Sequence, residues 1–148
     1  MIARVDDVAS ILEAKGSEVL RIEGSATVLD AVKRMVEANV GSLLVVEDGE
    51  LKGIVTERDY LRRVTLEGRN EKETPVREIM TAPLVYVTPD TSIEECMAVM
   101  TERRIRHLPV LTETREVAGI VSIGDVVKFQ SRQQHAQIRL LTDYISSS

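Results

Sequence analysis

The sequence predicts a mixed α/β (α+β) fold made from two copies of one unit, in the order strand, helix, strand, strand, helix. Three observations support this prediction. The stretch "GIVTERDYL" at 53–61 returns as "GIVSIGDVV" at 119–127. The apolar pattern of the first half recurs in the second half. Each half also alternates β-rich runs with an apolar stripe of helical period. A repeat of this length determines the architecture of the whole chain.

The two copies align along most of their length. At an offset of 65, the identical pairs are Met35 with Met100, Glu37 with Glu102, Leu43 with Leu108 and Val45 with Val110. The second copy then has one extra residue in a turn. At the resulting offset of 66, the identical pairs include Gly53 with Gly119, Ile54 with Ile120, Val55 with Val121 and Asp59 with Asp125. The chain is therefore a duplicated unit.

Each copy starts with a short β-rich run, "EVLRI" at 18–22 and "LVYV" at 84–87, followed by a turn cluster. A helix follows, and Thr27-x-x-Asp30 and Ser92-x-x-Glu95 form plausible capping boxes at its two starts. Residues at i, i+3, i+4 and i+7 give each helix one buried face. These residues are Val28, Ala31, Val32, Met35 and Val36 in the first copy, and Ile93, Cys96, Met97 and Met100 in the second.

The runs "SLLVVE" and "LPVLT" predict a second strand, "EDGEL" and "ETREV" a hairpin turn, and "GIVT" and "GIVS" a third strand. A short helix is expected to begin at each aspartate. After the second copy, the helical pattern runs on past 130, with a break or bend expected near Gln130, where polar residues interrupt it. The predicted boundaries are 1–14 for an N-terminal helical segment, 15–66 and 76–130 for the copies, 67–75 for a polar linker and 131–148 for a C-terminal helical extension.

Composition restricts the class of protein. A chain of 148 residues with 43% hydrophobic side chains can bury a core without disulfides or metals. The single cysteine, Cys96, fits a reducing compartment. With no secretory start and no apolar run near 18 residues, we expect a cytoplasmic protein without membrane association. The net charge of −5 is dispersed and aromatic residues are few, so nucleic acid is a poor partner.

Several stretches resemble signatures of the CBS-domain family. They are "NVGSLLVVEDGELKGIVTERDYLRRV" in the first copy, and "REIMT", "RIRHLPVL" and "GIVSIGDVV" in the second. The chain looks like a tandem CBS pair, or Bateman module, over about residues 15–130. More specifically, it resembles the small stand-alone CBS-pair signal-transduction proteins. The resemblance implies two copies packed around a pseudo-twofold axis, with two clefts that each use residues of both copies.

A strand that delivers Thr56, followed after two intervening residues by Asp59 at the first turn of a helix, brings together a hydroxyl, backbone N–H groups and a positive helix end. Asp59 suits hydrogen bonds from ribose hydroxyls, as acidic residues make in other nucleotide folds, and Arg58 could supply charge to a phosphate. In the CBS family the matching hydroxyl and aspartate contact the phosphate and ribose of an adenosine ligand. The simpler interpretation is that both residues only cap the helix.

The resemblance assigns fifteen residues to nucleotide binding. The first cleft would combine Thr56, Arg58, Asp59, Thr81, Val85, Ile105, Arg106 and His107. The second would combine Ser122, Asp125, Lys15, Gly16, Val40, Gly41 and Ser42. Because Gly124 replaces Arg58 and Gly41-Ser42 replace Arg106-His107, we expect the cleft at Asp59 to bind charged nucleotides more tightly. Lys15 would be the only cation of the other.

No catalytic or metal residues are predicted. The sequence has no Ser-His-Asp arrangement, Walker loop or set of metal ligands, so an enzyme is improbable. His107 has no cluster of ligating residues near it at the required spacing. Cys96 aligns with Ala31, an apolar helical position, and is expected in the core.

The expected function is a regulatory module that binds AMP, ADP or ATP and changes conformation in a homodimer, with no cofactor required. The alternatives are NAD(H) or S-adenosylmethionine as the ligand, or a structural adaptor with no ligand. CBS pairs commonly dimerise through their helices, and the C-terminal segment could reinforce that contact or fold back on its own chain. An unknown effector protein would act in trans.

Overall fold

The structure is a computed structural model that describes the backbone of residues 7–147 and the side chains of residues 7–142. The chain forms two compact units. The first unit comprises residues 18–85. The second unit comprises the preceding residues 7–17 together with residues 86–147, so each unit contains one copy of the repeat. The predicted α/β fold class is confirmed.

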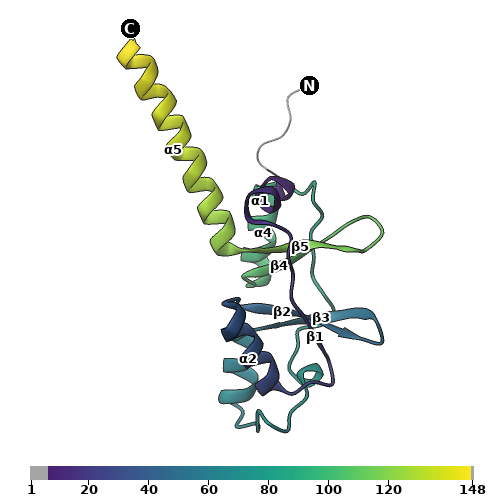
Figure 1. The fold of residues 1–148 in the computed structure, drawn as a ribbon. Coiled ribbons are helices and arrows are strands. Elements are labelled where there is room, and N and C mark those ends of the chain that lie inside the picture. The colour runs from purple at the N-terminus through teal and green to yellow at the C-terminus, as the bar shows by residue number, and fades with distance from the viewer. Residues whose placement is uncertain (1–6, 148) are drawn as a thin grey trace. The chain divides into compact units, whose positions relative to one another are not determined.

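The first unit contains a sheet of three strands with helices beside it (Figure 1). In chain order its elements are β1 (Arg21–Glu23), α2 (Val28–Ala38), β2 (Ser42–Glu47), β3 (Glu50–Thr56), α3 (Glu57–Tyr60), the π-helical turn η1 (Leu61–Thr65) and the 3-10 turn η2 (Val76–Glu78). Strand β2 lies in the centre, parallel to β1 and antiparallel to β3.

Local sequence explains the ends of these elements. The Thr27 side chain accepts from the backbone N–H of Asp30, and the Asp30 side chain accepts from that of Thr27, which forms the predicted capping box of α2. Helix α2 ends at Asn39 in the left-handed conformation. The hairpin turns at Asp48-Gly49, where both residues have positive φ. The core comprises Ile22, Val28, Ala31, Met35, Leu43, Val45, Val55, Val64, Val76 and Ile79.

The segment predicted as a linker is an integral part of the first unit. The first backbone N–H groups of a helix have no partner within the helix. Here the N–H of Val28 donates to the carbonyl of Thr74 at 2.9 Å, and that of Leu29 donates to the carbonyl of Glu71 at 3.0 Å. The Tyr60 hydroxyl also donates to the Glu71 carboxylate at 2.7 Å. Residues 70–75 therefore complete the start of α2.

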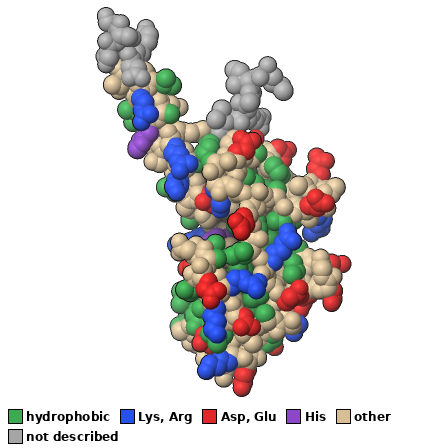
Figure 2. All heavy atoms as spheres, viewed as in Figure 1, with side chains coloured by type: hydrophobic (Ala, Val, Ile, Leu, Met, Phe, Trp, Pro, Cys, Tyr) green, Lys and Arg blue, Asp and Glu red, His purple; other side chains and the backbone are tan. Residues whose placement is uncertain are grey.

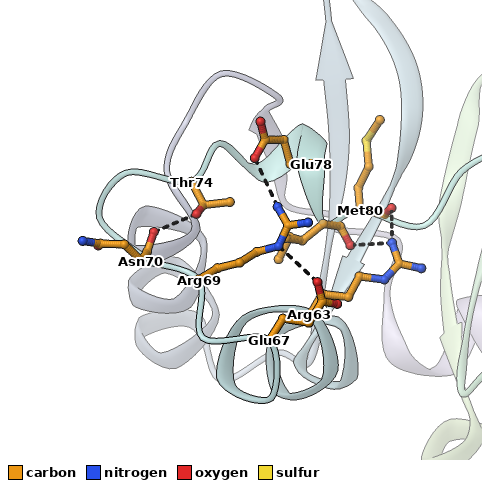
Figure 3. A network of polar contacts seen from close by, with 8 residues as sticks. Arg63, Glu67, Arg69, Asn70, Thr74, Glu78 and Met80 are labelled. Atoms are coloured by element: carbon orange, nitrogen blue, oxygen red, sulfur yellow. Dashed lines mark hydrogen bonds and ion pairs between the residues drawn. The ribbon is translucent and has the colours of Figure 1, made fainter.

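Further polar contacts connect the same segment to its neighbours in the first unit (Figure 3). Arg69 forms ion pairs with Glu67 and Glu78 at 3.4 and 3.3 Å. The Arg63 guanidinium donates to the backbone carbonyls of Ile79 and Met80. These bonds join η1, the predicted linker and the stretch after η2 into one structure.

The second unit contains α1 (Val8–Lys15), α4 (Ile93–Arg103), the hairpin β4 (His107–Leu111) and β5 (Val117–Ser122), and α5 (Ile123–Ser147) (Figure 1). Helix α1 buries Val8, Ile11 and Leu12, and Asp7 caps its start by accepting from the N–H of Ser10. The sequence boundaries assigned Lys15 to the first copy, but it lies at the end of α1, in the second unit.

Two local predictions were wrong. Residues 84–87 do not form a strand, and only Val87 pairs, in a parallel bridge with Val110. Pro83 and Pro89 flank the run and have no N–H group for a longer ladder. Helix α5 also continues for 25 residues without a break near Gln130. Its polar middle contains no glycine or proline, and polar side chains on an exposed helix face do not interrupt the backbone hydrogen bonds.

Candidate functional site

The first-copy motif lies where β3 ends and α3 begins. The backbone N–H and the hydroxyl of Thr56 lie 2.9 and 3.1 Å from Oδ2 of Asp59. In return, the N–H of Asp59 donates to the Thr56 hydroxyl at 3.2 Å. These bonds form a capping box, which is the simpler interpretation of the motif. The box also holds the hydroxyl and the carboxylate together at the end of the strand.

Thr81 joins this site from the segment that follows η2. Its hydroxyl donates to Oδ1 of Asp59 at 3.0 Å, so both carboxylate oxygens have a donor. Its backbone pairs with Ile54 of β3, with N–H to carbonyl distances of 2.8 and 3.1 Å. A Cβ on Gly53 would lie 2.6 Å from the Thr81 carbonyl oxygen, so only glycine permits this close approach. The structure therefore brings Thr56, Asp59 and Thr81 together, and their part in binding a nucleotide stays a prediction.

The second-copy motif has the same geometry at the junction of β5 and α5. The backbone N–H of Ser122 donates to Oδ2 of Asp125 at 2.8 Å. The N–H of Asp125 donates to the Ser122 hydroxyl at 3.1 Å. The repeat therefore reproduces the arrangement of hydroxyl and carboxylate in both units.

Lys15 reaches this second motif from the last turn of α1. Its ammonium donates to Oδ2 of Asp125 at 2.6 Å and to the backbone carbonyl of Ile120 at 2.9 Å. Burial acts to raise the pKa of Asp125. The hydrogen bond and charge of Lys15, with the hydrogen bonds from Ser122, outweigh burial and lower that pKa below its ordinary value. The carboxylate is therefore held ionised.

Lys15 and Thr81 occupy corresponding places in the two units. Both contact the motif aspartate, and both donate to the carbonyl of the isoleucine at the same strand position, Ile120 or Ile54. A threonine uses its hydroxyl and its backbone N–H, whereas the lysine uses its ammonium for both. The sequence contained a signal for this relation, because Lys15 and Thr81 are separated by the same 66 residues as the two aspartates.

The strand-entry residues lie beside the motif of their own copy. The N–H of Glu57 donates to the carbonyl of Gly41 at 3.2 Å, and Ser42 pairs with Thr56 across the hairpin. In the second unit, the N–H of Ile123 donates to the carbonyl of Arg106 at 2.9 Å, and His107 pairs with Ser122. Arg58 follows Thr56 by two residues in α3.

The other predicted residues are Gly16, which caps α1, Val40 after α2, Val85 and Ile105. The predicted combination of residues from both copies in each cleft, and the tighter binding at Asp59, stay predictions.

The second unit also has a surface hollow of about 740 Å³ that the sequence did not predict. Its lining includes Arg106, Lys128 and Arg132 around Ile123 and Val127. Lys128 and Arg132 lie one and two turns along α5 from Gly124. Three cations therefore gather beside the start of α5, and helical spacing from the motif could have indicated the two on the helix.

Other side chains give no sign of metal or thiol chemistry. In the part of the chain that the structure describes, no three His, Cys, Asp or Glu side chains are grouped to hold a metal ion. Cys96 is buried, and burial raises the pKa of its thiol to about 11. Within residues 7–147, no helix combines the length and the apolar character needed to cross a membrane.

The CBS-domain family model matches residues 5–65 and 76–132, which together contain both motifs. The chain belongs to the CBS-domain family. Across 147 aligned residues, it is 42% identical to the mitochondrial CBS domain-containing protein CBSX3 of Arabidopsis thaliana, covering 93% of this chain and 71% of the relative.

Solved structures agree with this membership. A candidate signal-transduction protein with CBS domains from Burkholderia ambifaria has a TM-score of 0.79 at 50% identity, over 82% of this CBS protein and 91% of its own chain. A hexameric CBS-CP12 protein from bloom-forming cyanobacteria has a TM-score of 0.73 at 36% identity, over 82% and 69%. The predicted tandem CBS pair is confirmed, and the chain is a CBS-pair protein of the signal-transduction type.

Proposed function

We propose that this CBS-pair protein is a regulatory sensor that binds an adenine nucleotide, AMP, ADP or ATP, at its two motifs. The observation that carries the proposal is the duplicated cap, in which Thr56 with Asp59, and Ser122 with Asp125, place a hydroxyl and a carboxylate together at a strand end. Proteins of this family are generally regulatory. A carboxylate at this position accepts from ribose hydroxyls, and the hydroxyl beside it is able to bond to a phosphate oxygen.

The cations support an anionic ligand. Arg58 lies within the first motif, and Arg106, Lys128 and Arg132 gather beside the start of α5. Their gathering at the motifs is notable because the chain as a whole carries a net charge of −5. Nucleotide phosphates would interact favourably with such sites.

Regulation would follow from population shift. A ligand that binds one conformation of the protein more tightly moves the population toward that conformation, by no more than the difference in affinity. An effector that recognises the same conformation would then respond to the nucleotide. In this proposal the effector is a separate protein that acts in trans.

Isothermal titration calorimetry with AMP, ADP, ATP, NAD⁺, NADH and S-adenosylmethionine tests the proposal. The variants Asp59→Asn and Asp125→Asn should each lose binding at their own motif. The matched control is Asp30→Asn, because Asp30 sits in the same kind of capping box at the start of α2 and belongs to neither motif. Binding lost in Asp59→Asn and kept in Asp30→Asn supports a ligand contact beyond capping.

The alternatives predict different results in the same experiment. Tight binding of NAD(H) or S-adenosylmethionine with none of AMP, ADP or ATP would change the ligand and keep the sensor. Saturable binding of no compound would contradict the proposal and favour a structural adaptor. Chromatography of each nucleotide after incubation checks for products, and turnover would indicate an enzyme.

We also propose that the protein forms a homodimer, with the C-terminal part of α5 in the interface. This part extends away from the other elements of its unit, and apolar and basic side chains lie along it (Figures 1 and 2). Ile138, Leu140 and Leu141 are 60%, 70% and 63% exposed. Three large apolar side chains so close together favour a protein partner. The hexameric CBS-CP12 relative supports self-association in this family.

Sedimentation equilibrium tests the dimer. The double variant Ile138→Asp with Leu141→Asp should shift the protein toward monomer. The control, Gln133→Asp with Ala136→Asp, adds the same charge to the same helix away from the face of Ile138 and Leu141. Dimerisation of the Ile138→Asp, Leu141→Asp variant as strong as that of wild type would exclude this part of α5 from the interface.

A further inference from the structure

The Lys15 ammonium is held in a defined position by the rest of α1. The helix is capped by Asp7, and the N–H of Val8 donates to the carbonyl of Thr91 at 2.9 Å. Leu12, one turn before Lys15, packs so closely on β5 that a Cβ on Gly119 would lie 2.6 Å from its Cδ2 atom. The packing of α1 therefore fixes the backbone position of Lys15, and from there its side chain reaches Asp125.

The ammonium retains hydrogen-bonding capacity in this position. A lysine ammonium has three N–H donors. Two of them go to Oδ2 of Asp125 and to the carbonyl of Ile120, at 2.6 and 2.9 Å. The Lys15 side chain is 36% exposed, so a third donor remains for another group.

The Asp125 carboxylate has matching capacity as an acceptor. Its Oδ2 atom accepts from both Ser122 and Lys15. Its Oδ1 atom accepts no hydrogen bond from the described residues of the chain. The corresponding Oδ1 of Asp59 differs, because it accepts from the Thr81 hydroxyl. An open donor and an open acceptor therefore lie side by side at the second motif, and the first motif lacks the ammonium.

A hydroxyl group fits this pair. It accepts one hydrogen bond through a lone pair and donates one through its hydrogen, whereas a phosphate oxygen could only accept. Both bonds would involve a charged partner, and such bonds are stronger than neutral ones. The pair is neutral as a whole, so it recognises the hydroxyl without requiring a charged ligand.

We propose that Lys15 is a specificity-determining residue of the second motif, where its ammonium and Oδ1 of Asp125 together hold one ribose hydroxyl of the bound nucleotide. This inference rests on the proposed function and adds to it the group that reads the sugar. The second motif then discriminates ribonucleotides from deoxynucleotides through Lys15. In the first motif the Thr81 hydroxyl occupies the Oδ1 atom of Asp59, so we expect no lysine-dependent preference for ribose there.

The test compares AMP, ADP and ATP with their 2′-deoxy and 3′-deoxy forms by titration calorimetry, in an Asp59→Asn background that leaves the second motif to report. Removal of the recognised hydroxyl should weaken binding about tenfold or more, the range for hydrogen bonds to charged groups. In Lys15→Met this preference should fall several-fold, because the hydroxyl keeps only its bond to Asp125. Lys15→Arg should keep it, and Lys52→Met, in the exposed pair of Lys52 with Glu50, serves as the control.

Each other outcome overturns the inference in a recognisable way. An unchanged ribose preference in Lys15→Met would make Lys15 a structural ion pair only. A loss that grows from AMP to ATP, with the ribose preference kept, would make it a phosphate ligand. If wild type binds no nucleotide, the proposed function fails with it. Should Lys15→Met not fold, as circular dichroism would reveal, Lys15→Ala takes its place, and a retained ribose preference there contradicts the inference.

Discussion

The Thr81 hydroxyl donates a 3.0 Å hydrogen bond to Oδ1 of Asp59, from a segment 22 residues further along the chain. Thr81→Val keeps the shape of the side chain and removes this bond to a charged group. We expect a loss of about 1.5–3 kcal/mol in the free energy of unfolding, since the buried carboxylate loses a donor. Urea denaturation measures it. Thr101→Val, at an exposed position of α4, is the control and should change little.

Two glycines should respond in opposite ways to the same substitution. Gly53→Ala places a methyl group 2.6 Å from the backbone oxygen of Thr81, and we expect a loss of about 1–3 kcal/mol in unfolding free energy. Gly124→Ala lies in the first turn of α5, with Ser122 Oγ at an ordinary 3.6 Å, and should stabilise by up to about 1 kcal/mol. Chemical denaturation compares them, and a destabilised Gly124→Ala would contradict the assigned helix start.

The ion pair of Lys15 with Asp125 predicts a pH dependence of stability. The pKa of Asp125 is lowered in the folded protein, below the value of about 3.9 for an unfolded aspartate. The ionised carboxylate therefore contributes stability above the unfolded pKa, and this contribution disappears as the pH falls through the lower, folded pKa. The loss of stability on acidification should be smaller in Lys15→Met than in wild type.

Urea denaturation from about pH 7 to pH 3 measures this difference between wild type and Lys15→Met. Lys52→Met is the matched control, because it breaks an exposed ion pair that solvent screens. A parallel acid profile of wild type and Lys15→Met would show that the ion pair contributes nothing to folding.

The thiol of Cys96 should react slowly in the native protein. The side chain is fully buried in α4, and burial raises the pKa of the thiol to about 11, so little thiolate forms near pH 8. Labelling with a chromogenic disulfide reagent should be much slower in the native state than in denaturant. Rapid labelling without denaturant would mean that α4 opens readily.

The sequence predicted the repeated parts of the fold and missed contacts without a repeated pattern. Helical spacing and capping residues identified α2 and α4, and β-rich runs with turn residues identified the two hairpins, because those signals are local. The run at 84–87 has β-rich residues, yet pairing also needs a partner strand, and only Val87 finds one. The role of residues 70–75 depends on backbone carbonyls that meet α2, and the polar composition of the segment carries no sign of them.

The candidate site was predicted to a similar degree. The hydroxyl and aspartate of both motifs and the neighbouring Thr81 were identified from the repeat and the family. Lys15 was expected as a cation for the second cleft, but its ion pair with Asp125 was not foreseen, because α1 was expected to be a separate N-terminal segment. An amphipathic helix pattern reveals that a helix has a partner and leaves the identity of that partner open.

The first unit is an insertion in the chain of the second. Residues 7–17 and 86–147 flank residues 18–85, so the chain crosses between the units twice. During synthesis α1 is made before the first unit, and its partners β5 and α5 are made after that unit. A single proteolytic cut at either crossing leaves the units tethered by the other. Expression of residues 86–148 alone would omit Lys15 and the buried face of α1, whereas residues 18–85 contain every element of their own unit.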